Sequence, residues 1–138
     1  MANQLLKGKR GIITGALDES SIAWKVAQRA HQEGAQFTLT NAPIAMRMGE
    51  IHKLAQATGA KVIPADATSL SDLNTLYQES MQAMGGKIDF VLHSIGMSVN
   101  IRKNLPYTAL NYEYFNKGID VSALSFHKML AVAHQLDA

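Results

Sequence analysis

The chain has 138 residues, of which 47% are hydrophobic and 17% are charged, a composition typical of one folded domain rather than of a disordered segment. Thirteen Lys and Arg against eleven Asp and Glu give a formal net charge of +2 without any basic run, so nothing indicates nucleic-acid binding. The absence of cysteine excludes disulfides, and no apolar stretch approaches a signal peptide or the roughly 18 residues of a membrane helix, so we expect a soluble, cytoplasmic protein with no membrane partner.

Short apolar runs and amphipathic stretches alternate through the first 60 residues. The run RGIIT ends at Gly15 and predicts a strand buried on both faces. The stretch that follows has its apolar residues on one helical face and is closed by Gly34. The predicted elements, in chain order, are a strand at residues 10–14, a helix at 21–33, a strand at 36–40, a turn at 41–43 and a helix from about 45 to 58.

The second half continues this alternation and then becomes less regular. Its predicted elements are a strand at residues 61–64, a helix at 71–84, a strand at 88–93, a loose stretch to about 106, and a helical region from 111 to the end in which a break near Gly118 is left open. Because strand and helix alternate four times, we expect an α/β fold with a Rossmann-like, doubly wound parallel sheet of strand order 3-2-1-4. In this fold the fourth strand needs a fifth beside it, since an open apolar edge invites aggregation. We therefore expect residues 1–138 to be the N-terminal dinucleotide-binding part of a single Rossmann-type domain, truncated before the later strands.

The turn between the first strand and the first helix is the candidate phosphate-binding site. A pyrophosphate requires close approach of the backbone and the positive end of a helix. Gly15 allows the turn, Ser21 can cap the helix or contact a phosphate oxygen, and Ala23 is small enough for close packing of helix on strand. The G-x-G-x-x-G fingerprint is absent, so an ordinary strand-to-helix turn with a serine N-cap is the alternative.

Small and polar residues also follow the third and fourth predicted strands. Ala65-Asp66-Ala67-Thr68 comes after the third, and Ser94-Ile95-Gly96 comes after the fourth. Each segment alone is compatible with an ordinary turn. Because the carboxyl ends of parallel strands lie at one edge of a sheet, three such strand ends together predict one ligand crevice.

The segments TGALDESSIAWKVA, ADAT and DFVLHSIG together resemble the enoyl-acyl-carrier-protein reductases of bacterial fatty-acid synthesis, a divergent branch of the short-chain dehydrogenase/reductases. The G-x5-S-I-A spacing from Gly15 to Ala23 is characteristic of that branch, and the resemblance runs through nearly all of the chain. It implies hydride transfer from NADH, with NADPH as the alternative, to a trans-2-enoyl thioester on acyl carrier protein. It also implies a homotetramer.

The resemblance further implies roles for individual residues. The implied cofactor contacts are Gly15, Ser21 and Ile22 at the diphosphate and ribose, Ala42 after the second strand, Asp66 and Ala67 beside the adenine, Ser94, Ile95 and Gly96 beneath the ribose and nicotinamide, and Val121 on the nicotinamide side. Ser98 falls where the family's backbone meets the acyl substrate.

The residues after the second strand bear on the choice between NADH and NADPH. The sequence Thr40-Asn41-Ala42 contains no carboxylate to hold the ribose 2′-hydroxyl. Ala42 stands where the resembled family often has a polar side chain. Arg47 is near enough in sequence to meet a 2′-phosphate, but it also fits a solvated helix arginine. The residues leave the choice open, and the resemblance favours NADH.

The catalytic acid of the resembled family is a tyrosine followed by a lysine seven residues later, and the wider superfamily uses a spacing of four. None of the four tyrosines, Tyr77, Tyr107, Tyr112 and Tyr114, has a lysine at either distance. We therefore expect the proton donor and its lysine partner beyond Ala138, and no turnover by this chain alone.

The histidines lack metal-ligand spacing, so no metal site is expected. A ketoreductase-type short-chain dehydrogenase is one alternative; a non-catalytic NAD(P)-binding module is another if the natural chain ends at Ala138.

Overall fold

The core of the molecule is a sheet of four parallel strands in the order β3-β2-β1-β4, which confirms the predicted topology. The computed structural model describes residues 3–138. The strands are β1 (Arg10–Thr14), β2 (Gln36–Thr40), β3 (Lys61–Val62) and β4 (Phe90–Leu92), and the helices are α1 (Ile22–Gln32), α2 (Pro43–Met48), α3 (Ile51–Thr58), α4 (Leu70–Met84), α5 (Val99–Arg102), the 3-10 helix η1 (Tyr107–Ala109), α6 (Tyr112–Ile119), the π-helix η2 (Asp120–Leu124) and α7 (Ser125–Gln135). Ile12 of β1 pairs in register with Thr38 of β2 and with Val91 of β4, so β1 lies inside the sheet.

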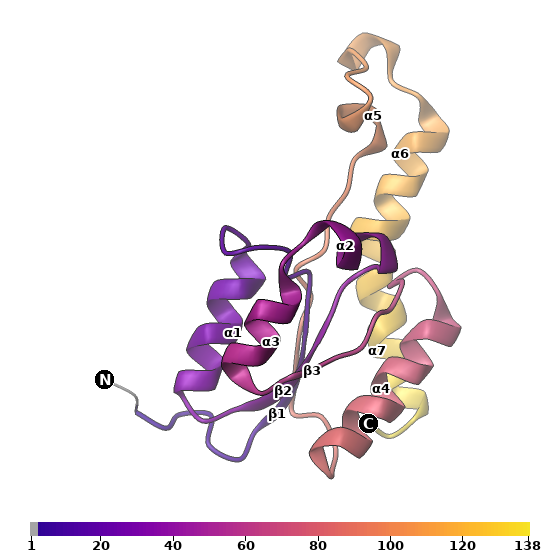
Figure 1. The fold of residues 1–138 in the computed structure, drawn as a ribbon. Coiled ribbons are helices and arrows are strands. Elements are labelled where there is room, and N and C mark those ends of the chain that lie inside the picture. Colours follow the sequence, from indigo (N-terminus) through magenta and orange to yellow (C-terminus); the bar gives the residue numbers. More distant parts are fainter. Residues whose placement is uncertain (1–2) are drawn as a thin grey trace.

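Helices cover both faces of the sheet (Figure 1): α1 and α3 lie on one side, and α4 and α7 on the other. Successive residues of a strand point to opposite faces. Ile13 belongs to the apolar cluster that includes α1 and α3, whereas Ile12 belongs to the cluster that includes α4 and α7. Both side chains are fully buried, so the prediction that the first strand is buried on both faces is confirmed.

The second predicted helix is wrong as a single element, because α2 and α3 are separate helices. The chain adopts an extended conformation at Gly49 between them. A Cβ at Gly49 would lie 2.6 Å from the Leu17 carbonyl oxygen, and the Glu50 N–H donates to that same oxygen at 2.7 Å. The helix is interrupted because the chain must pass this close to the turn after β1.

The third and fourth strands are shorter than predicted, and the helix after the third begins one residue earlier. The backbone beyond β3 still follows β2, since the Ile63 and Ala65 N–H groups donate to Leu39 and Asn41 carbonyls at 2.9 and 3.1 Å. Helix α4 starts at Leu70 because the Ser69 hydroxyl accepts the Asp72 N–H and caps it.

The C-terminal region has no break at Gly118. Helix α6, the π-turn η2 and helix α7 follow one another directly, so the irregularity falls at Asp120–Leu124. The backbone hydrogen bond of a π-turn spans five residues where that of an α-helix spans four, and such turns are often found at functional sites. The irregularity is therefore a local widening rather than an end of the helix.

The predicted loose stretch after β4 contains α5 and η1, and it projects away from the sheet together with the start of α6 (Figure 1). A pair of asparagines joins the two sides of this arm. The Asn111 N–H donates to Asn100 Oδ1 at 2.9 Å, and Asn100 Nδ2 donates back to the Asn111 carbonyl at 3.1 Å. Asn100 is buried although it lies far from the main core.

Two kinds of feature are absent within the described range 3–138. No helix there is both long and apolar enough to cross a membrane, and no three His, Asp or Glu side chains gather in a group that could hold a metal ion.

Candidate cofactor site

The turn after β1 crosses the backbone that leaves β4 at very short range. Gly15 has φ +84°, in the left-handed region that favours glycine. A Cβ at this position would lie 1.8 Å from the Ser94 carbonyl oxygen. The Gly15 N–H also donates to the Thr40 carbonyl at 3.1 Å. The ends of three strands thus meet at a residue that only glycine can occupy without displacing its neighbours.

Ser21 occupies the N-cap position of α1, but of the two roles expected for its hydroxyl, a helix cap or a phosphate contact, the cap is not formed. Its Oγ accepts the N–H groups of Leu17 and Asp18, both at 3.0 Å, and makes no hydrogen bond to the first turn of the helix. The serine therefore holds the preceding turn together. The N-terminal end of α1 has no side-chain cap from this residue, and Ile22 at its first position is 75% exposed. An uncapped helix N-terminus is a favourable site for an anion.

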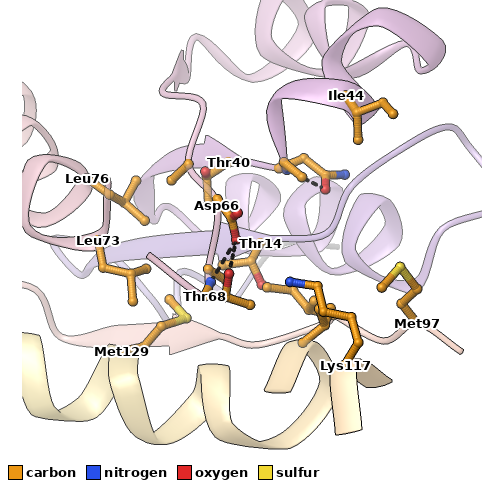
Figure 2. A pocket seen from close by; sticks show the side chains of 16 residues that line it. Thr14, Thr40, Ile44, Asp66, Thr68, Leu73, Leu76, Met97, Lys117 and Met129 are labelled. Atoms are coloured by element: carbon orange, nitrogen blue, oxygen red, sulfur yellow. Dashed lines mark hydrogen bonds between the residues drawn. The ribbon is translucent and has the colours of Figure 1, made fainter. Parts of the chain in front are cut away.

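Asp66 and Thr68 form a closed turn after β3, and Figure 2 shows the two side chains facing one another at the cleft. Thr68 donates to Asp66 Oδ1 through its hydroxyl at 2.7 Å and through its N–H at 2.9 Å. The hydroxyl bond first, then the N–H bond, lowers the pKa of the Asp66 carboxyl below its ordinary value, and the positive charges of Lys117 and Lys128 act in the same direction. Asp66 is therefore an ionised, outward-facing acceptor at this strand end.

A cleft of about 250 Å³ lies at the carboxyl edge of the sheet and continues into a second hollow of about 280 Å³ beside Gly15. The first is lined by Ala42, Asp66, Ala67, Ile95 and Val121, and the second by Gly15, Ser94, Ile95 and Gly96. The structure thus brings together eight of the ten residues that the family resemblance assigns to the cofactor. Ser21 and Ile22 line neither hollow and lie at the start of α1.

Ser98, the predicted substrate contact, lies outside the lining of both hollows. It caps the short helix α5, where its hydroxyl accepts the Ile101 N–H at 3.4 Å. Arg47 is exposed on α2 and lines neither hollow. His93 hydrogen-bonds Ser125 and packs edge-on against Phe126, which is a structural role.

Two polar residues outside the predicted set of site residues, Thr14 and Asn41, hold the frame of the site. Thr14 donates to the Leu92 carbonyl at 2.8 Å and accepts the Ser94 N–H at 3.0 Å, so it fixes the exit of β4 against β1. Asn41 donates to the Ala16 carbonyl at 2.9 Å and accepts the Ala42 N–H at 2.9 Å. Both stand at the ends of predicted strands, which is the same signal that identified Asp66 and Ser94.

A parallel sheet of order 3-2-1-4 with a glycine crossing and an uncapped helix at its carboxyl edge defines the Rossmann class of dinucleotide-binding folds. Residues 15–137 match the family model described as Enoyl-(Acyl carrier protein) reductase. The chain belongs to that family.

Curated relatives and a solved structure agree with this assignment. The chain is 32% identical over 136 residues to the Enoyl-[acyl-carrier-protein] reductase [NADH] 1 of Rhizobium meliloti, with 98% of this chain and 49% of the relative covered. It is 36% identical over 123 residues to the Mycobacterium avium Enoyl-[acyl-carrier-protein] reductase [NADH], with 86% and 45% covered. A crystal structure of a FabI-NADH complex from Alistipes finegoldii superimposes with a TM-score of 0.96 at 55% identity, covering 98% of this chain and 48% of that one. The chain thus spans about half the length of these relatives.

Proposed function

We propose that this chain forms the NADH-binding part of an enoyl-acyl-carrier-protein reductase, which reduces trans-2-enoyl thioesters carried on acyl carrier protein. The observation that supports this most directly is the Gly15 crossing beside the uncapped N-terminus of α1. A dinucleotide's pyrophosphate requires both close backbone approach and the positive end of a helix.

The geometry of this edge fits the cofactor. We assign Gly15, Ser21 and Ile22 to the diphosphate, where the helix end favours negative charge. The part of the first hollow formed by Ala42, Asp66 and Ala67, after β2 and β3, is assigned to the adenosine half, and the exit of β4 with Val121 to the nicotinamide half. NADH supplies the hydride when it is bound, and these residues hold and orient it. Ser98 remains our candidate for contact with the acyl substrate, since it is close in sequence to this exit.

We propose NADH rather than NADPH. No acidic or basic side chain from the end of β2 lines the cleft, and Ala42 stands there instead. A 2′-phosphate is normally met by an arginine at this position. Arg47 is exposed on α2 and lines neither hollow, which favours the solvated interpretation. The relatives are named as NADH enzymes, in line with this choice.

We propose that the proton donor and its lysine belong to the other half of a protein of the relatives' length. None of the four tyrosines here has a lysine four or seven residues further on. This chain then binds and orients the cofactor without turnover. Exposed apolar side chains on α6 and α7, among them Phe115, Phe126 and Leu130, support packing against further protein, in keeping with a cytoplasmic homotetramer.

Titration of the chain with NADH, NADPH and ADP-ribose tests the cofactor assignment. Trp24, the only tryptophan, is buried on α1, and its emission can report ligand binding near the start of that helix. We expect saturable binding of NADH and ADP-ribose and weaker binding of NADPH. A protein of the relatives' length is expected to oxidise NADH with a crotonyl thioester. Activity on 3-ketoacyl but not on enoyl thioesters would refute the reaction, and absence of any NADH binding would refute the site.

A further inference from the structure

We propose that Gly118 and Ser122 together hold the backbone of Met97 in place. Through this contact they set the position of the Ser94–Gly96 segment, which is assigned to the nicotinamide half. The proposal rests on the cofactor site proposed above and adds a positioning residue, Ser122, to it. The proposal is based on close contacts that Gly118 and Ser122, on one face of the helix, make with the backbone of Met97 in the segment that leaves β4.

Ser122 holds both polar groups of the Met97 backbone. The Met97 N–H donates to Ser122 Oγ at 3.0 Å, and Ser122 Oγ donates to the Met97 carbonyl at 3.3 Å. The first distance is ordinary for an N–H···O bond and the second is long for an O–H···O bond, so the first carries most of the interaction. Met97 and Ser122 are both only partly exposed to solvent, so loss of the Ser122 hydroxyl would be costly for the Met97 backbone groups that it bonds.

Gly118, one turn earlier on α6, lets the helix come close enough for these bonds to form. A Cβ at Gly118 would lie 3.1 Å from the Met97 carbonyl oxygen, tighter than nine in ten real Cβ contacts, so the Met97 backbone would have to shift by a few tenths of an ångström. Residues four apart on a helix lie on the same face. The glycine and the serine therefore contact the same backbone unit, one by close approach and the other by hydrogen bonding.

The π-turn supplies a second attachment to the same segment. Ser125, directly after η2, donates to the Val121 carbonyl at 2.6 Å, and its Oγ lies 2.7 Å from His93 Nε2. Because the serine proton is used on Val121, the histidine donates in this pair. The segment between His93 and Met97 is thus held at one end by Ser125, the first residue of α7, and at the other by Ser122 of the π-turn. Between those ends lie the residues assigned to the nicotinamide half.

The expected consequence is a selective weakening of ligands that contain nicotinamide. The residues assigned to the adenosine half, Ala42, Asp66 and Ala67, follow β2 and β3, whereas Ile95, Met97 and Val121 line the same cleft from the β4 side, with β1 between the two groups of strands. Removing one hydrogen bond of this kind is expected to weaken NADH binding roughly three- to tenfold. ADP-ribose, which lacks nicotinamide, should bind to the variant as it binds to the wild type.

The test compares NADH and ADP-ribose affinities in Ser122→Ala, Ser122→Thr, Gly118→Ala and the exposed control Ser71→Ala. Ser122→Ala and Gly118→Ala should each raise the Kd for NADH while the Kd for ADP-ribose stays constant. Ser122→Thr retains the hydroxyl and should restore NADH binding. Gly118→Ala adds a strong helix former, so a loss of NADH affinity there does not reflect a weaker helix. Amide hydrogen exchange at Met97 should accelerate in Ser122→Ala.

The outcomes separate this inference from the proposed function. If the Kd values for NADH and ADP-ribose rise equally, or if neither changes, the positioning role of Gly118 and Ser122 is refuted. The proposed cofactor site is not affected by that result. Unchanged exchange at Met97 would also overturn it. Failure of the wild-type chain to bind either ligand would refute the cofactor site and this inference together.

Discussion

Replacing Gly15 with alanine tests the crossing on which the cofactor site depends. The added Cβ would lie 1.8 Å from the Ser94 carbonyl oxygen, which is 1.2 Å short of the 3.0 Å that real Cβ atoms keep. The neighbour is backbone and not the end of a flexible side chain. The turn after β1 and the backbone that leaves β4 must therefore move apart. This movement would strain the hydrogen bond from the Ser94 N–H to the Thr14 hydroxyl, which joins the two segments.

Two separate effects determine how much Gly15→Ala should lower the free energy of unfolding. A side chain at φ +84° costs about 1–2 kcal/mol in backbone conformation. Forcing two packed segments apart costs a further ~1–3 kcal/mol. The total of roughly 2–5 kcal/mol is a large part of the 5–15 kcal/mol typical of a domain. Gly59→Ala is the matched control, because Gly59 has φ +70° and an added Cβ there would meet nothing within 4 Å.

Urea unfolding followed by Trp24 emission measures both variants, and NADH titration follows on each folded protein. Gly15→Ala should lower the free energy of unfolding by about 1–3 kcal/mol more than Gly59→Ala does. It should also weaken NADH binding more than tenfold, while Gly59→Ala binds as the wild type does. Equal stabilities of the two variants would refute the crossing, because only the clash distinguishes them.

Three further substitutions probe other contacts. Tyr77 is buried, its hydroxyl finds no hydrogen-bond partner among residues 3–138, and burial raises its pKa to about 12; Tyr77→Phe should therefore stabilise the fold by about 1 kcal/mol in denaturant unfolding, whereas a loss would indicate an unseen partner. Thr68→Val removes the hydroxyl that lowers the Asp66 pKa, so NMR titration should show this pKa rising towards 3.8. A lowered carboxyl pKa adds stability above the unfolded-state value and loses it as pH falls through the folded-state value, so the two proteins should converge in stability in acid. Lys128 donates to the Thr68 carbonyl at 3.0 Å and to Asp120 at 2.7 Å; Lys128→Met should weaken NADH and ADP-ribose alike, and selective loss of NADH would contradict the adenosine-side assignment.

The topology could be predicted from the sequence because each strand has a distinct apolar run and each early helix has a clear end. The error at residues 45–58 has a different origin. Nothing in the local pattern around Gly49 shows that the chain must approach Leu17, because that contact is made by residues 32 positions apart. The π-turn was missed for a similar reason. Ser122 within it bonds to Met97 and Ser125 directly after it bonds to His93, and a helical pattern does not reveal such long-range partners.

Most of the candidate site could be located from one expectation, that ligand-binding residues follow the carboxyl ends of the parallel strands. It placed Gly15, Asp66 and Ser94 at one edge without any knowledge of side-chain geometry, because parallel strands require it. It could not show which of the lining residues also hold the walls of the cleft in place through hydrogen bonds to the backbone. Thr14 and Asn41 line the cleft as Asp66 does, but their hydrogen bonds also run to the backbone of β4 and of the turn after β1, so they fix the frame of the site.

Ser21 shows why the glycine-poor turn can still serve an anion. In a glycine-rich turn the backbone N–H groups are free to meet a phosphate. Here the Leu17 and Asp18 N–H groups are already bound to Ser21 Oγ, and the Ser20 N–H is bound to Asp18 Oδ1. The turn is therefore preorganised by its own side chains, and we expect the proposed diphosphate to meet the uncapped start of α1 rather than these N–H groups. Ser21→Gly should consequently weaken NADH binding through loss of order in the turn, and ADP-ribose should weaken to the same extent because both ligands share the diphosphate.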